Sequence, residues 1–220
     1  MNKVVYVFAI IFLVICLFVT SMDVYSQHVV RTLSDNVIRL HVVANSNHPQ
    51  DQELKLKVRD NVLTYLKQNT QGFPVDESDL SKAEFFIKSR LDEINEVAQQ
   101  TVLEHGYDYP TVTSYGDFYF PVKEYDNFAL PSGLYSALRI EIGQSCGENW
   151  WCVLYPPLCF PEGSLGLIEK EKVQLFVQSI SDENAKVIFL DSSGEPNIRF
   201  KIVEFFQSIK KRIQVDHASK

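Results

Sequence analysis

The sequence is short of positive charge. Its 21 Lys and Arg residues are outnumbered by 28 Asp and Glu residues, which gives a net charge of −7 over 220 residues. A nucleic-acid-binding protein needs a basic surface to neutralise phosphates, so this balance argues against a nucleic-acid partner. The length and the hydrophobic content of 45% fit one globular domain that is large enough to bury a core.

The sequence also lacks the common signatures of catalytic sites. It contains no GxSxG, HExxH, Walker A or GxGxxG pattern. Its many Asp and Glu residues form no recognisable acid–base pair. His41 alternates with apolar residues, which suits a surface or packing histidine better than a general base. We therefore predict no catalytic residue and no cofactor, and we expect a protein that is not an enzyme.

Cysteine is scarce. Cys16 lies in an apolar N-terminal run, which leaves Cys146, Cys152 and Cys159. Three cysteines without a nearby histidine make a poor zinc site, because structural zinc takes four ligands, and no metal is predicted. In an exported protein they suggest one disulfide and one free thiol. A reactive Cys152 paired with His41 would instead make a thiol-dependent hydrolase, which is the less favoured alternative.

The N-terminus carries an export signal. Lys3 precedes an uninterrupted apolar run, Val4–Val19, and small residues follow it. A short positive segment, an apolar core and small residues are the parts of a secretory signal peptide. We predict a signal peptide over residues 1–26. An uncleaved N-terminal anchor is the alternative, although the run is near the lower length limit for a spanning helix.

The remaining chain groups its helical and strand patterns. Apolar residues alternate in strand fashion in four stretches: 37–44, 111–120, 134–142 and 150–155. Helical stripes recur in three: 49–67, 81–105 and 198–213. This grouping predicts an α+β fold with an antiparallel sheet, in which a β-meander in the middle of the chain joins an N-terminal strand and an αα-hairpin packs on the sheet. We assign residues 35–160 to this domain and 161–220 to a variable C-terminal extension with a terminal amphipathic helix.

The patterns also predict which faces are buried. The lead-in from Val29 to Asp35 is expected to be a polar segment before the first strand. In the stretch 111–120, the set that begins with Thr111 and Thr113 is polar and aromatic, and we expect it to face water. In the last helix the stripe Ile198, Ile202, Phe205 and Ile209 is expected to pack on the domain.

An unusual aromatic segment, GENWWCVLYPPLCF, occupies residues 147–160 and holds both tryptophans. Successive residues of a strand point to opposite faces, so Trp150 and Trp151 cannot both enter one core. An exposed tryptophan beside Pro156 and Pro157 would make a good anchor for a partner. The alternative is that the domain's own elements cover both rings.

Three stretches of this chain are similar to one known family. They are IRLHVVANSNHPQDQELKLKVRDNVL at 38–63, PVKEYDNFALPSGLY at 121–135 and YSALRIEIGQSCGENWWCVLYPPLCF at 135–160. Together they make residues 35–160 resemble the stage II sporulation protein R family of endospore-forming bacteria. Residues 161–220 carry no recognised match.

This resemblance implies a signalling role. Such proteins are made in the forespore and secreted into the intermembrane space between the two sporulation membranes. There they activate a membrane-embedded aspartic protease of the mother cell, stage II sporulation protein GA, which processes the precursor of sigma-E. Membrane contact is expected only through the N-terminal signal or anchor.

The aromatic segment is the predicted contact surface for that protease. The predicted partner-binding residues are Trp150, Trp151, Tyr155, Pro156, Pro157 and Arg139. Tyr135, on the same predicted strand as Arg139, is a further candidate. A disulfide between Cys152 and Cys159 would close a small loop around the two prolines. A secreted cell-wall or membrane-surface binding module, which would use the aromatic strand faces and the basic last helix, is the alternative function.

Overall fold

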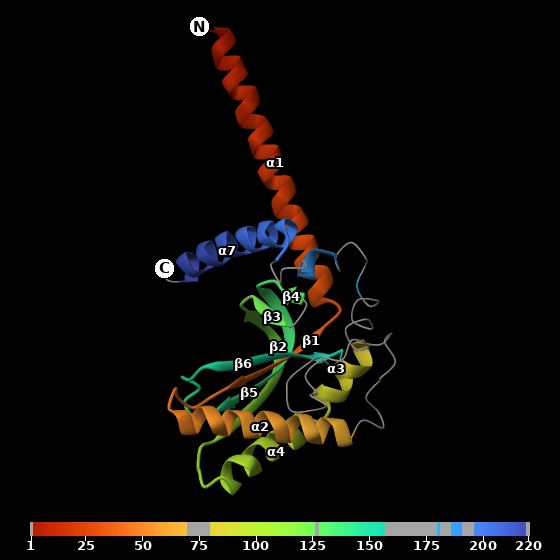
Figure 1. Cartoon of the computed structure of the whole chain (residues 1–220), viewed down its shortest axis with the longest axis vertical. Helices are drawn as coiled ribbons and strands as arrows, with labels where there is room; N and C mark the ends of the chain where they lie inside the picture. Colours follow the sequence, from red (N-terminus) through yellow and green to blue (C-terminus); the bar gives the residue numbers. More distant parts are fainter. Residues whose placement is uncertain are drawn as a thin grey trace. The chain divides into compact units, whose positions relative to one another are not determined.

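The computed structural model describes residues 2–69, 80–125, 128–156, 180, 186–190 and 196–218, with side chains described as far as residue 209 (Figure 1). The described helices are α1 (Asn2–Ser34), α2 (Pro49–Gln68), α3 (Leu80–Lys88), α4 (Leu91–Glu104) and α7 (Ile198–Ala218). The described strands are β1 (Ile38–Val43), β2 (Thr111–Phe120), β3 (Lys123–Tyr125), β4 (Phe128–Leu130), β5 (Gly133–Ile142) and β6 (Asn149–Tyr155). The chain packs into two compact units, each built from segments that are distant in the sequence.

One unit contains Ser34–Tyr119 and Leu134–Ser181, and it is built on a four-stranded sheet. The strand order is β2-β5-β1-β6, with β1 parallel to β5 and antiparallel to β6. The predicted α+β class is confirmed. The predicted meander is wrong in its order, because β1 lies between β5 and β6. All six residues of β1 are buried, and a strand that is apolar on one face and shielded on the other is best placed at the centre of a sheet.

The helices of this unit cover one face of the sheet, and α2 and α4 lie side by side there (Figure 1). The helix predicted over 49–67 is confirmed as α2. The helix predicted over 81–105 is broken into α3 and α4 at Ser89 and Arg90. The predicted αα-hairpin packed on the sheet is therefore present, with a short extra helix before its second arm. The core between helices and sheet includes Leu40, Val42, Val58, Val62, Ile94, Ala98, Leu138 and Ile140.

In strand β2, the threonine side chains that were predicted to face water instead face helix α4. Thr111 is buried and its backbone N–H donates to Gln99 Oε1 of α4 at 2.9 Å, while Val112 is 57% exposed. The hydroxyl of Thr113 also donates to α4, to Asn95 Oδ1 at 3.1 Å. The expectation that the threonine set faces water is thus wrong. The amide side chains of α4 satisfy these hydroxyls, so polar residues occupy a helix-covered face without an unpaired-group penalty.

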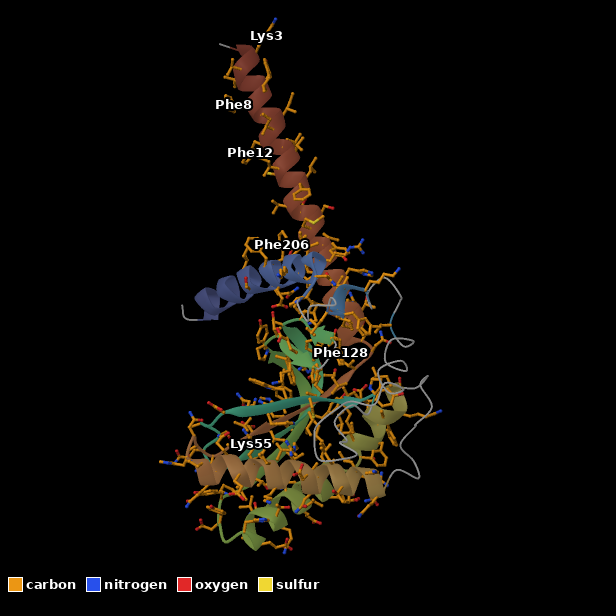
Figure 2. The ribbon with its side chains drawn as sticks, viewed as in Figure 1. Lys3, Phe8, Phe12, Lys55, Phe128 and Phe206 are labelled. Carbon is orange, nitrogen blue, oxygen red and sulfur yellow. The ribbon has the colours of Figure 1, made fainter. Side chains whose placement is uncertain are left out.

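The other unit contains Met1–Leu33, Phe120–Gly133 and Asp182–Lys220. Phe8 and Phe12 project from the exposed apolar part of α1 (Figure 2), and this helix is long and apolar enough to cross a membrane. Its last turns are different, because Val29 and Leu33 are fully buried. The lead-in predicted as polar is therefore helical and partly apolar. The N-terminal helix is compatible with a signal peptide or an anchor, and the predicted domain boundaries stay predictions.

A polar junction joins the end of β1 to the turn between β5 and β6. Asn45 donates from Nδ2 to Asp51 Oδ2 at 2.8 Å, and its Oδ1 accepts the backbone N–H of Gln144 at 2.9 Å. The hydroxyl of Ser46 donates to the same Asp51 oxygen at 2.6 Å. The Gly147 backbone N–H donates to Ala44 O at 3.0 Å. These bonds hold the start of α2 and the start of β6 to one strand end.

The start of α2 explains why Pro49 and Asp51 occupy their positions in the sequence. Pro49 occupies the first turn of α2, where a missing N–H costs nothing, and His48 precedes it without a side-chain capping bond. Three side chains donate hydrogen bonds to the Asp51 carboxylate. Burial works to raise the pKa of this carboxyl, but the bonds from Ser46, Asn45 and Tyr109 outweigh burial and lower it. Asp51 is therefore a buried anion near the positive end of the helix.

We predict that Gly147→Ala destabilises the protein while Gly116→Ala does not. A Cβ at Gly147 would lie 2.3 Å from the backbone oxygen of Ser46, so the turn would have to shift. A Cβ at Gly116 would meet only the Phe118 ring, at 3.8 Å. We expect a loss of at least about 2 kcal/mol in the free energy of unfolding for Gly147→Ala and a change within about 0.5 kcal/mol for Gly116→Ala. Urea denaturation of both variants measures this, and equal stabilities would contradict the junction's role.

Candidate functional site

The two tryptophans lie on opposite faces of β6, as the alternation predicts. In the antiparallel register with β1, Trp150 is opposite Val42 and Trp151 is opposite His41. Val42 belongs to the core beneath the helices, so Trp150 lies on the helix-covered face and Trp151 on the other. Strand β6 is also the last strand of its sheet among the described strands. The two tryptophans of the predicted contact surface are therefore divided between two faces at a sheet edge.

Trp150 is held at the surface by α2. Its side chain is 36% exposed, and the guanidinium carbon of Arg59 lies 4.1 Å from the centroid of its ring. The same guanidinium is fixed by Asp60, with Nη2 and Oδ1 2.7 Å apart. A cation over an indole face is worth about 0.5–1 kcal/mol at an exposed site. Trp150 is thus a large aromatic side chain that is oriented by its neighbours and still open to solvent.

Trp151 belongs to a packed row on the opposite face. Its ring stacks on that of His41, with the centroids 5.8 Å apart. Nε2 of His41 lies 2.8 Å from Oδ1 of Asn149, an acceptor, so we assign the proton to Nε2. Burial lowers the pKa of His41, the nearby cations Arg139 and Arg39 lower it further, and the Asn149 bond works in the opposite direction. This histidine is therefore neutral near pH 7 and packs against Trp151.

Arg139 extends this row onto the next strand. It is opposite His41 in the parallel register of β1 and β5. Its guanidinium forms an ion pair with Glu141 at 2.8 Å and lies 5.2 Å from the centroid of the Phe118 ring. Arg139, His41 and Trp151 therefore cross three adjacent strands on one face. Of the predicted contact residues, only Arg139 and Trp151 are brought together in this way.

The sequence pattern does not single out Arg39 as a buried residue. This arginine alternates with apolar residues and reads as a solvent-facing side chain, yet it is fully buried, with its guanidinium carbon 4.9 Å from the centroid of the Tyr135 ring. Tyr135, a further candidate for partner contact, is also buried, with 1% of its surface exposed. The alternation gave the correct face for Arg39. The alternation could not show that the face of the sheet opposite the helices is covered around Arg39.

The end of β6 does not lie at the surface. Tyr155 is 5% exposed and belongs to the helix-side core, and Pro156, which follows a cis peptide bond, is also buried. Pro157 lies outside the described residues. Buried side chains offer little area to a partner, so the exposed part of the predicted surface reduces to Trp150, with Trp151 and Arg139 half-buried on the other face. The role of these residues in binding stays a prediction.

The cysteines fit a structural role. Cys152 is disulfide-bonded and 7% exposed, whereas Cys16 and Cys146 are free thiols. Cys159 lies outside the described residues, so its pairing with Cys152 stays a prediction. A disulfide removes the thiolate that a Cys152 nucleophile would need. Cys152 is also opposite Leu40, on the face of the sheet away from His41, so the two do not form the pair that a thiol-dependent hydrolase requires.

The part of the chain that the structure describes contains no group of three or more His, Cys, Asp or Glu side chains that could hold a metal ion. Lys55 is a buried cation whose Nζ donates to the backbone oxygen of Glu148 at 3.0 Å and to Gln52 Oε1 at 2.6 Å. Burial lowers the pKa of Lys55. Lys55, labelled on α2 in Figure 2, therefore fastens the helix to the start of β6 and is a supporting residue of the Trp150 surface.

We predict that His41 makes the protein less stable in mild acid. Its pKa is lowered in the folded state from about 6.5 in the unfolded chain. As the pH falls below about 6.5, the unfolded state binds a proton first, so stability that is fully present above this pH is lost as the pH falls towards the folded-state pKa. Denaturant melts of the wild type and His41→Gln between about pH 7 and pH 5 measure the effect. Parallel pH profiles for the two proteins would contradict it.

Comparison with known proteins finds a sequence match over the part of the chain that contains the sheet domain. The sequence model described as stage II sporulation protein R matches residues 34–164, which is more than half of the chain. Stage II sporulation protein R of Bacillus subtilis (strain 168) is 37% identical over 144 residues, covering 64% of this chain and 61% of that protein. The chain thus spans about three fifths of the length of this relative. No solved structure matches significantly. The chain belongs to the stage II sporulation protein R family.

Proposed function

We propose that this protein is a signalling ligand that activates a membrane-embedded aspartic protease of the mother cell, stage II sporulation protein GA, and so starts processing of the sigma-E precursor. Family membership supports a role in sporulation. The apolar N-terminal helix supports export or membrane attachment. We further propose that the folded part works in the intermembrane space after secretion from the forespore.

The observation that carries this proposal is the presentation of Trp150. It is a large aromatic side chain at a sheet edge, 36% exposed, with its orientation fixed by the Arg59 guanidinium. Tryptophan is over-represented among the residues that contribute most to protein–protein binding. Because Arg59 and the strand already restrict its rotamers, little conformational entropy is lost when a partner covers it. Trp150 is therefore suited to be an anchor.

Activation by such a ligand follows from differential binding. A ligand shifts a protease from an idle to an active arrangement only if it binds the active arrangement more tightly. A shift from one active molecule in a hundred to ninety-nine in a hundred needs a preference of about 10⁴-fold. In this proposal an aromatic anchor supplies part of that preference, because the pocket that accepts it exists only in the active arrangement.

Co-production in a host that does not sporulate tests the function directly. We expect cleavage of the sigma-E precursor when this chain, the protease and the precursor are made together, and little cleavage when this chain is omitted. Immunoblotting of the precursor measures this. A catalytically inactive protease variant is the control for cleavage by host enzymes. Equal cleavage with and without this chain would refute an activating role.

We predict that substitutions of the two tryptophans have different effects. Trp150→Ala should reduce precursor cleavage severalfold while lowering the free energy of unfolding by only about 1 kcal/mol, mainly through the lost contact with Arg59. Trp151→Ala removes a half-buried ring that stacks on His41 and should cost about 2–3 kcal/mol of stability.

Cleavage and urea denaturation are measured for both variants, with Leu103→Ala as the matched control. Leu103 is a large apolar residue of α4 in the same unit and is 52% exposed. Its loss tests whether removing any exposed apolar side chain reduces cleavage. If cleavage falls only in proportion to the loss of folded protein in both tryptophan variants, the segment is a core element and Trp150 is not an anchor.

A further inference from the structure

Helix α7 buries one face and leaves three of the four residues of its predicted apolar stripe exposed, while Ile202 is half-buried. The sequence predicts that Ile198, Ile202, Phe205 and Ile209 pack on the domain. Among the α7 side chains that the structure describes, which end at residue 209, the buried ones are Phe200, Val203 and Gln207. Helical spacing puts these three on the side opposite to the stripe. The predicted packing face is therefore wrong, and α7 has two apolar faces, of which the more regular one is turned outward.

The outward stripe is large for a water-facing helix. Ile198 is 75% exposed, Phe205 59% and Ile209 39%, and the Phe206 ring meets that of Phe205 edge-on at 5.5 Å. The described part of the chain therefore leaves Ile198, Phe205 and Ile209 accessible to solvent. A contiguous apolar patch of this kind usually marks a contact with a partner or a membrane.

The inner face fixes α7 to α1. The hydroxyl of Ser26 in α1 donates to the backbone oxygen of Val203 at 3.2 Å, and Gln207 Nε2 donates to Ser26 Oγ at 3.1 Å. All three residues are buried in the same unit. On the other side, Glu204 accepts the backbone N–H of Ser132 at 2.6 Å from the loop after β4. Burial raises the pKa of Glu204, and this bond opposes the rise.

The position of this contact along α1 bears on what covers the exposed stripe of α7. The apolar run ends at Val19, and the contact is at Ser26 in the same unbroken helix. Seven residues at about 1.5 Å each make about 10 Å along the axis. The hydrocarbon core of a bilayer is about 30 Å thick and the headgroups extend it to about 40–45 Å. If α1 enters a bilayer with Val4–Val19, α7 is held at the level of the headgroups.

The charge of α7 agrees with an anionic surface. The helix carries five Lys and Arg residues and two acidic residues, in a chain whose net charge is −7. Three of its cations, Lys210, Lys211 and Arg212, directly follow Ile209 in the sequence. An exposed apolar stripe next to a cluster of cations is the composition of a helix that lies in the plane of a membrane surface. Each cation near such a surface contributes a binding preference of about fivefold.

We infer that α7 lies on the surface of the membrane that α1 enters and binds its anionic headgroups, with the Ile198–Ile209 stripe in the lipid boundary. The unit of α1 and α7 is then a two-point attachment that restrains the chain at the membrane surface, and it requires that α1 is retained as an anchor. This contact with lipid does not depend on whether the chain activates the protease.

The test uses the full chain in lipid nanodiscs that contain phosphatidylglycerol, with hydrogen–deuterium exchange of α7 as the measurement. We expect Phe205→Glu with Ile209→Glu to speed exchange in α7 severalfold, because two charges cannot enter the lipid boundary. Ser208→Glu is the matched control, since Ser208 is exposed on the same helix but outside the stripe. Its exchange should stay near that of the wild type. Equal exchange in the wild type and the double variant, or an equal increase in the control, would overturn the inference.

The double variant could disturb the packing of α7 on α1, and faster exchange in residues 26–33 would reveal this. A second measurement covers that case. A photoreactive amino acid replaces Phe205 in the otherwise unchanged chain, and Leu103 in a control chain. Lipid adducts at position 205 and few at position 103 support the inference. Adducts of protein mass at position 205, or no lipid adduct there, overturn it.

Discussion

The side chain of Asn45 is the constraint on which the placement of the candidate site depends. One of its atoms donates to Asp51 at the start of α2, and the other accepts from Gln144 in the turn before β6. Asp51 is six residues further along the chain and Gln144 is 99 residues further along, so one side chain fixes a helix and a distant strand to the same strand end. Strand register has a period of two, and a shift of one residue would exchange the faces of Trp150 and Trp151. The junction therefore decides which indole is available to a partner.

Local periodicity predicted much of this fold. It identified α2, the existence of each strand of the main sheet, and the division of the two tryptophans between faces. It failed where the answer depends on distant partners. The position of β1 between β5 and β6 is a choice among pairings that no local pattern distinguishes. The inward turn of Thr111 depends on amides supplied by α4. Burial of Arg39 depends on a ring from another strand.

The same limit explains α7 and the candidate site. An apolar stripe shows that a helix face avoids water, and it does not show whether protein or lipid covers it. In α7 the less regular face, with Phe200 and Val203, is the one that packs. In β6 the aromatic segment has a high content of anchor-type residues, but tertiary packing buries Tyr155 and leaves Trp150 exposed. The tertiary fold therefore decides which residue of such a segment is available to contact a partner.

The proposed contact between Trp150 and the protease can be tested by site-specific crosslinking. A photoreactive amino acid at position 150, in a chain co-produced with stage II sporulation protein GA, is compared with the same group at position 103. We expect a crosslinked complex from position 150 and little from position 103. Crosslinks from neither position, while the precursor is still cleaved in a manner that depends on this chain, would rule out Trp150 as the contact residue.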